Sequence, residues 1–264
     1  VTLANISGAG LDITGFDTQI GSLGGGGAAG GNVSLGAAVL TVGTLNTFTS
    51  FDGSISGAGG RLVKKGLGTL TLGGNNSYSG GTSVDDGELL INGTHTGGGL
   101  ISVSATATLG GGGQAGNAEF LSGGTLAPGR ADPGDNWLQV EVLTLGHDLT
   151  QLNFDLGAPD DGLASRPEND LVVAAEIPLL RGVLNVNPLA GFASAPPGSK
   201  WRLFENAGGG TPGAHEIILC AGVPSDYTIQ AYVGDNSVYL VAVPEAATSG
   251  LTLFGLLLLL RHRA

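Results

Sequence analysis

The most regular alternation of hydrophobic and polar positions lies in residues 59–93, where two short runs of similar construction flank a polar stretch. Successive side chains of a β-strand point to opposite sides, so alternation predicts strands that are buried on one side. The expected inward residues are Leu70, Leu72, Leu89 and Ile91, and the expected outward residues are Thr69, Thr71, Glu88 and Leu90. Glycines and asparagines between residues 73 and 81 favour tight turns. The unit is therefore predicted to be strand, corner, strand.

A small residue, a polar residue and a leucine recur along the chain at a nearly constant spacing. The leucines of this motif are Leu70, Leu89, Leu109 and Leu126, which gives steps of 19, 20 and 17 residues. Such a period marks a solenoid, and a turn of this length is too short to contain a crossover helix. We therefore expect an all-β fold, a right-handed parallel β-helix over residues 1–190, with 59–93 as its clearest repeat unit.

The same residues also resemble a known family. Residues 66–93 read G-x-G-T-L-T-L-x-G-x-N-x-Y-S-G-G-T-x-V-x-x-G-x-L-x-x-N-G, which resembles the autotransporter-associated β-strand repeat of bacterial surface proteins. The resemblance is close over these residues and weaker over about residues 20–130. It implies a β-helical, passenger-like domain on the outside of a bacterium, and it implies no catalytic residue.

The remaining strands are predicted from alternation and turn signals. Between Ile101 and Leu109 the hydrophobic residues Val103, Ala105 and Ala107 are expected to point inward, with serines and threonines outward. In residues 191–243 we expect an irregular β cap, because Gly234-Asp235-Asn236 separates two strand patterns and indicates a hairpin. Antiparallel strands of this kind would cover the open edge of the rod.

The last segment, residues 244–264, differs from the rest in having an uncharged apolar run over 246–260 followed by basic residues. We expect one hydrophobic helix that holds the body outside the inner membrane, since arginines resist translocation. The layout resembles the Pro-Glu-Pro C-terminal sorting signal that an exosortase cleaves in Gram-negative bacteria. Its signal residues here are Val243, Pro244, Glu245, Arg261 and Arg263. Ala246 stands where the second proline is usual, so this chain departs from the pattern at that position.

Composition supports a folded chain and disfavours several functions. The 41% of hydrophobic residues suffice to offset chain entropy despite 50 glycines. A net charge of −12 disfavours nucleic acid. The lone Cys220, without a Cys/His cluster, indicates neither a disulfide nor zinc, and we expect no cofactor. Val1 is followed by no charged or apolar leader, so we expect a processed end or a fragment boundary.

Candidate chemistry is sparse. Gly25-x-Gly27-x-x-Gly30 matches a dinucleotide fingerprint, but no helical pattern follows it. The histidines, including His95 and the pair His147-Asp148, are scattered, and each is expected to be a surface imidazole. We therefore expect a non-enzymatic surface or secreted protein with a role in adhesion, extracellular matrix or envelope structure, with polysaccharide or other surface proteins as partners.

The alternative is a carbohydrate-active β-helical enzyme, a lyase or glycosidase, that uses the acids of residues 155–170. Glycoside hydrolysis needs two carboxyl groups about 5–10 Å apart. The densest acidic region supplies candidates in Asp155, Asp160, Asp161, Glu168 and Asp170.

Overall fold

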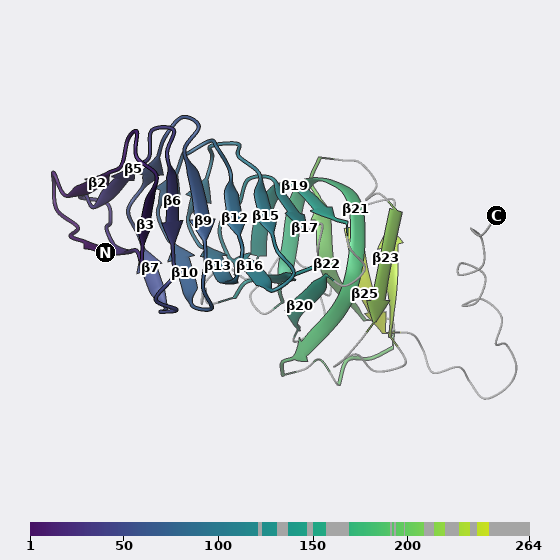
Figure 1. The fold of residues 1–264 in the computed structure, drawn as a ribbon. Helices are drawn as coiled ribbons and strands as arrows, with labels where there is room; N and C mark the ends of the chain where they lie inside the picture. Colours follow the sequence, from purple (N-terminus) through teal and green to yellow (C-terminus); the bar gives the residue numbers. More distant parts are fainter. Residues whose placement is uncertain are drawn as a thin grey trace, which may run out of the picture.

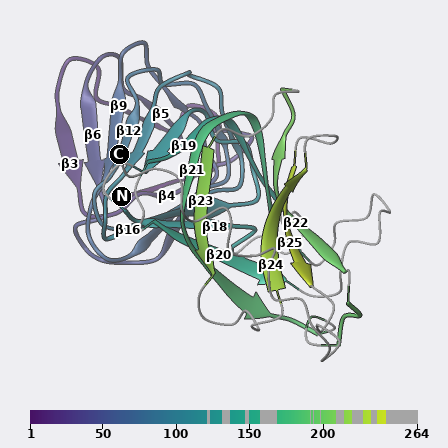
Figure 2. The same cartoon turned by 90° about the vertical axis from the view of Figure 1, so that its right-hand side faces the viewer.

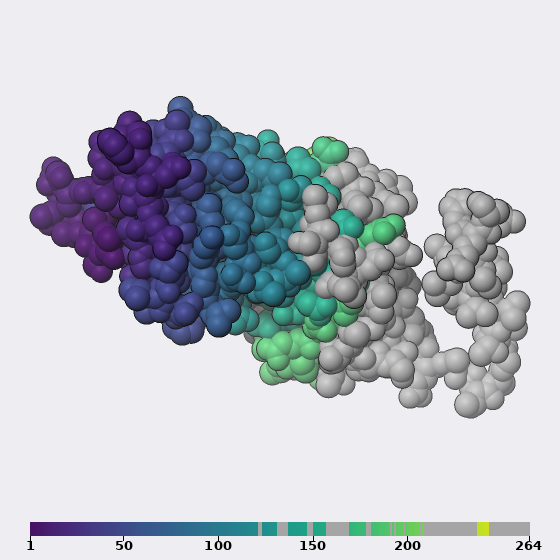
Figure 3. All heavy atoms as spheres, viewed as in Figure 1, coloured from purple at the N-terminus to yellow at the C-terminus, as the bar shows by residue number. Residues whose placement is uncertain are grey.

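A computed structural model describes residues 1–120, 123–130, 137–146, 150–156, 169–190, 192, 194–197, 199–208, 214–219, 227–232 and 237–242. Every regular element among them is a β-strand, so the all-β prediction is confirmed for this part of the chain. The strands coil into an elongated stack with the N-terminus at one end (Figure 1). In space-filling view the turns follow one another along the rod in sequence order (Figure 3).

Each turn of the coil contributes strands to three faces, and every pairing between consecutive turns of these faces is parallel. Face A contains β3 (Thr18–Ile20), β6 (Val39–Val42), β9 (Arg61–Lys64), β12 (Thr82–Val84), β15 (Ile101–Val103) and β17 (Ala118–Phe120). Face B contains β1 (Thr2–Leu3), β4 (Gly24–Gly25), β7 (Thr49–Phe51), β10 (Thr69–Leu72), β13 (Gly87–Ile91), β16 (Ala107–Gly111) and β18 (Thr125–Pro128). Face C contains β2 (Gly10–Asp12), β5 (Asn32–Ser34), β8 (Ile55–Ser56), β11 (Asn75–Asn76) and β14 (Thr94–His95). Seen from the end, these turns overlie one another around a common interior (Figure 2).

The leucine period of the sequence is the register of face B. Leu70 pairs with Leu89, Leu89 with Leu109, and Leu109 with Leu126. Each of these side chains is at most 2% exposed. Leu72, Ile91 and Val103, which were also predicted to point inward, are buried as well. The parallel stack inferred from the spacing is therefore confirmed.

Exposure departs from the predicted alternation at two positions, and the prediction that Ala105 points inward is wrong. Ala105 is exposed, because residues 104–106 form the corner between β15 and β16 and the alternation runs through two strands instead of one. Leu90 points outward in the alternation of β13, yet it is only 2% exposed. Arg130, which follows β18, contacts this outward side of face B, since its Nε lies 2.5 Å from Glu88 Oε1.

Glycine is required where backbones of successive corners touch. A Cβ on Gly97 would lie 1.8 Å from the carbonyl oxygen of Tyr78. Gly87 has φ 65°, and its Cβ would lie 2.4 Å from the carbonyl oxygen of Gly66. Any side chain at these positions would push adjacent turns apart. The high glycine content is thus partly a consequence of close stacking at the corners.

Beyond residue 129 the turns lengthen and single strands bend across more than one face. The strands here are β19 (Trp137–Leu145), β20 (Gln151–Leu156), β21 (Leu171–Pro188), β22 (Lys200–Asn206), β23 (Ala214–Leu219), β24 (Tyr227–Tyr232) and β25 (Ser237–Ala242). The strand β21 pairs in parallel with β19, β20, β22 and β23. In contrast, β25 pairs antiparallel with β22 and β24, so the hairpin predicted near residue 235 is present.

Several expectations about the architecture stay predictions. These are the right-handedness of the coil and the division of the chain at residues 190 and 243. Residues 243–264, with the sorting signal, lie outside the described residues. Within the described part, no helix is long and apolar enough to cross a membrane.

Candidate functional site

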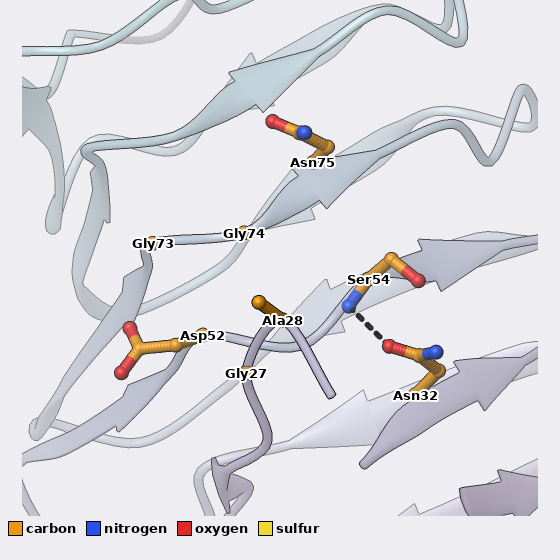
Figure 4. Close-up of a pocket in the computed structure, with 8 residues that line it drawn as sticks. All are labelled: Gly27, Ala28, Asn32, Asp52, Ser54, Gly73, Gly74 and Asn75. Atoms are coloured by element: carbon orange, nitrogen blue, oxygen red, sulfur yellow. Dashed lines mark hydrogen bonds between the residues drawn. The ribbon is translucent and has the colours of Figure 1, made fainter. Parts of the chain in front are cut away.

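A polar groove opens on the surface at the corners between face B and face C. It has a volume of ≈ 340 Å³ and is lined by Gly27, Ala28, Asn32, Asp52, Ser54, Gly73, Gly74 and Asn75 (Figure 4). The groove exists because the corner at residues 26–31 is longer than the corners stacked next to it, at 52–54 and 73–74. The longer corner therefore forms a wall, and the shorter corners form the floor.

Glycine is needed in the part of the floor at residues 73–74. A Cβ on Gly73 would lie 2.3 Å from Asp52 Oδ1, and one on Gly74 would lie 2.0 Å from the carbonyl oxygen of Gly53. The Gly25-x-Gly27-x-x-Gly30 pattern belongs to the wall, where Gly27 and Gly30 form an antiparallel bridge and the strand β5 follows. The pattern thus serves a corner, and no helix follows it, unlike in a dinucleotide fingerprint.

Hydrogen bonds fix the side chains of the groove while leaving polar groups toward solvent. Asn32 Oδ1 accepts from the backbone N–H of Ser54 at 2.9 Å (Figure 4). Asn75 Oδ1 accepts from the Thr94 hydroxyl at 2.8 Å. Asp52 Oδ1 accepts from the Ser50 hydroxyl at 3.1 Å. Both asparagines are exposed and held through their oxygens, so their NH₂ groups are available to a ligand.

The groove lies at one end of a row of polar side chains along face C. Asn75 pairs with Thr94, Thr94 with Gln114, and Gln114 with Gln139. Stacked strands are about 4.8 Å apart, so the row offers one amide or hydroxyl group per turn at that interval. Face C therefore carries an outward row of amide and hydroxyl groups.

A second group of polar side chains lies inside the rod. The Tyr78 hydroxyl is 2.6 Å from Thr82 Oγ1, and both residues are buried. Asn76 accepts from the backbone N–H of Ile55 at 3.0 Å and donates to the carbonyl of Gly74 at 3.1 Å. Burial raises the pKa of Tyr78, which keeps its hydroxyl protonated. These contacts tie corners together and use the polar atoms internally.

The prediction that His95 is a surface imidazole is wrong. His95 is 3% exposed, and its ring lies 4.6 Å from that of Tyr78, centroid to centroid. Among the described residues neither ring nitrogen has a hydrogen-bond partner. Burial lowers the pKa of His95 because the charged imidazolium is poorly solvated there. The register shows the reason for the burial, since His95 stacks directly on the inward Asn76.

We expect the stability of the rod to fall in acid because of His95. The imidazole titrates near its ordinary pKa of 6.5 in the unfolded chain and below it in the folded one, so protonation favours the unfolded chain as pH falls under 6.5. The loss cannot exceed about 1.4 kcal/mol per pH unit, or about 2 kcal/mol at pH 5. Urea unfolding of wild type and of His95→Phe, which keeps the ring and removes the titration, measures it. Parallel pH profiles for the two proteins would contradict this account.

Lys64 is another inward residue that the alternation alone did not identify. It is 1% exposed and stacks between Val42 and Val84. Its Nζ donates to three carbonyl oxygens, those of Lys65 at 3.1 Å, Gly66 at 2.7 Å and Asp86 at 3.1 Å. Burial lowers the pKa of Lys64, while the charges of Asp86 and Glu88 oppose this shift. The ammonium group thus joins the corners of two successive turns.

The acids of residues 155–170 are only partly brought together. Asp170 is 5% exposed, and its Oδ2 accepts from the backbone N–H of Asp155 at 2.6 Å. Burial raises the pKa of Asp170 to about 8, with the hydrogen bond from Asp155 opposing the shift and the Asp155 charge adding to it. Asp155 itself is exposed. Asp160, Asp161 and Glu168 lie outside the described residues, so among the five acids the described part brings together Asp155 and Asp170.

Other candidates give no site in the part of the chain that the structure describes. It contains no group of three or more His, Cys, Asp or Glu residues that could hold a metal ion. Cys220, His147 and Asp148 lie outside the described residues, as do the sorting-signal residues Val243, Pro244, Glu245, Arg261 and Arg263.

A family profile and two known proteins are similar to parts of this chain. A family profile described as Passenger-associated-transport-repeat matches residues 62–91. The Adhesin BmaC autotransporter of Brucella suis biovar 1 (strain 1330) is 50% identical over 91 residues, which are 34% of this chain and 3% of that protein. The Extracellular serine protease of Serratia marcescens is 33% identical over 142 residues, which are 53% of this chain and 12% of that protein. The chain therefore spans only a small part of the length of these curated relatives.

The matched stretch coincides with the internal polar cluster. It runs from Leu62 in β9 to Ile91 in β13 and contains Lys64, Asn76 and Tyr78. All three are buried; Lys64 and Asn76 form hydrogen bonds to the neighbouring turn, and Tyr78 bonds Thr82 within its own turn. The polar positions of this repeat unit thus hold stacked turns together in this chain.

Proposed function

We propose that this chain is part of an exported bacterial protein that displays a β-helical, passenger-like rod at the cell surface or outside the cell. The observation that carries the proposal is the repeat unit at residues 62–91, which matches a passenger-associated repeat and builds a parallel stack in register with its neighbours. The similarity to an adhesin and to an extracellular protease supports the same location.

The role that we propose is non-enzymatic, in adhesion, extracellular matrix or envelope structure. Inside the rod the polar groups of Asn76, Tyr78 and Thr82 form structural hydrogen bonds, and the outer surface offers a groove and a row of amides and hydroxyls. Such a surface suits binding more than bond cleavage. The carbohydrate-active enzyme remains the alternative, and release of reducing ends from polysaccharide that is lost in Asp160→Asn or Asp161→Asn would favour it.

We further propose that residues 244–264 are a sorting signal that anchors the protein transiently in the inner membrane until an exosortase-type enzyme cleaves near Val243, Pro244 and Glu245. The support is the apolar run at 246–260 followed by Arg261 and Arg263. A continuous apolar run is stabilised by a membrane, and the arginines favour the cytoplasmic side.

Surface exposure can be tested in the native host. We expect protease treatment of intact cells to release peptides from residues 1–190, and mass spectrometry of the mature protein to find a C-terminus near residue 243. A protein that resists the protease until the cells are lysed would contradict surface display. An intact Ala264 in surface material would refute cleavage while leaving display in place.

A further inference from the structure

We propose that the groove at the corners 26–31, 52–54 and 73–74 binds an uncharged, extended polysaccharide, which continues along the polar row of face C. The inference rests on the proposed function for its setting outside the cell. It adds the site and the chemical class of the ligand.

The groove presents hydrogen-bond donors and acceptors to a ligand. The amide oxygens of Asn32 and Asn75 are occupied by Ser54 N–H and the Thr94 hydroxyl, which orients both NH₂ groups as donors. The Asp52 carboxylate accepts from Ser50 and has further lone pairs to offer. Ordered donors beside acceptors match the hydroxyl groups of a sugar, which both donate and accept.

The lining of the groove disfavours anionic and apolar ligands. The lining contains no cationic residue and no aromatic or large aliphatic side chain among its eight residues. The carboxylate of Asp52 lies in the groove, and the whole chain has a net charge of −12, so sulfated, phosphorylated or uronic acid polymers are repelled. An apolar ligand would find little surface to bury against. An uncharged polyhydroxyl ligand is compatible with all of these features.

The main-chain hydrogen bonds around the groove favour a sugar chain over a peptide as the ligand. A peptide added as a β-strand needs an edge with unpaired main-chain groups. Around the groove these groups are used between turns, since Asp52 N–H donates to Gly25 at 2.8 Å and Gly73 N–H donates to Phe51 at 2.9 Å. Side chains are therefore the recognition groups that remain, and they repeat once per turn.

The site continues from the groove along the polar row of face C. Beyond Asn75 the row proceeds through Thr94, Gln114 and Gln139 along face C. Its spacing of about 4.8 Å is close to the length of one sugar unit in an extended chain. Successive sugar units can therefore meet equivalent groups on successive turns, and affinity is expected to rise with the length of the oligosaccharide.

Titration calorimetry of the purified chain with maltoheptaose, cellohexaose and dextran tests the proposal, with heparin as the anionic comparison. We expect at least one neutral glycan to bind and heparin to bind more weakly. The double variant Ser54→Ala/Asn75→Leu should weaken binding at least tenfold. Ala28→Leu, which fills the groove from its exposed wall and leaves the donors in place, should also weaken it. Thr41→Val, on the outward side of face A, is the matched control and should leave binding unchanged.

Circular dichroism melts establish that each variant is folded. The proposal is overturned if no neutral glycan binds, if both groove variants bind as wild type does, or if heparin or peptides from a casein digest bind more tightly than the neutral glycans. These outcomes are independent of where the protein resides, so failure here leaves surface display untouched. Loss of surface display in the host would leave a measured glycan affinity intact.

Discussion

Leu89→Asp is expected to lower the free energy of unfolding by about 4 kcal/mol. Leu89 is 0% exposed and stacks between Leu70 and Leu109 in the middle of the face B column. The new carboxyl group would have no solvent there, and the lost leucine would leave a cavity. Urea unfolding followed by circular dichroism measures the change. The loss should shrink at acid pH, because a protonated carboxyl is less costly to bury.

The matched control is Thr71→Asp, in the neighbouring strand of the same face. Thr71 points outward and is only half-buried, so a charge there keeps contact with water. We expect a loss below about 1 kcal/mol for this variant. Equal losses for the two variants would show that the inward and outward sides of face B have been assigned wrongly.

Lys64→Ala is expected to destabilise the rod by about 3–5 kcal/mol. The substitution removes a buried aliphatic stem and leaves the carbonyl oxygens of Lys65, Gly66 and Asp86 without their common donor. Water can replace the ammonium group only in part, because these hydrogen bonds lie in a partly buried corner between two turns. The same unfolding measurement applies. Amide hydrogen exchange should accelerate first in the corners at residues 65–68 and 85–86.

The adjacent lysine provides the control. Lys65 is half exposed, and its Nζ lies 4.0 Å from Asp85 Oδ2, so Lys65→Ala should cost less than about 1 kcal/mol. Lys64→Met separates the two contributions, since it keeps most of the stem and removes the donor. An unchanged stability of Lys64→Met would mean that the three hydrogen bonds add nothing to the fold.

The apolar ladder of the rod could be predicted from sequence because its period survives. Leu70, Leu89, Leu109 and Leu126 recur at steps that the chain uses as its register. Beyond Leu126 the column continues through Leu152 and Leu184, but longer segments separate these residues. The spacing of leucines in the sequence does not predict the register there, because the loops vary in length while the stacking of the strands does not.

The inward polar residues were harder to predict, because hydrophobic patterning places polar residues outside. Lys64 and Lys65 look equivalent in the sequence, yet one is buried and the other exposed. Register supplies the missing signal: Val42 and Val84 flank Lys64, and Asn76 precedes His95 by the same 19 residues that separate Leu70 from Leu89. The groove could not be found in this way, because it depends on the unequal lengths of stacked corners.

The parallel ladder also determines how a protein of this kind can change size. Each turn both donates hydrogen bonds to and accepts them from each of its two neighbours in the same parallel pattern, so a turn removed as a unit leaves two surfaces that still match. The rod can therefore become longer or shorter in steps of about 4.8 Å, each of which takes roughly 20 residues. An insertion shorter than a whole turn does not match this register and must protrude as a loop at a corner. Duplication of one repeat in the gene would therefore lengthen the rod by one turn.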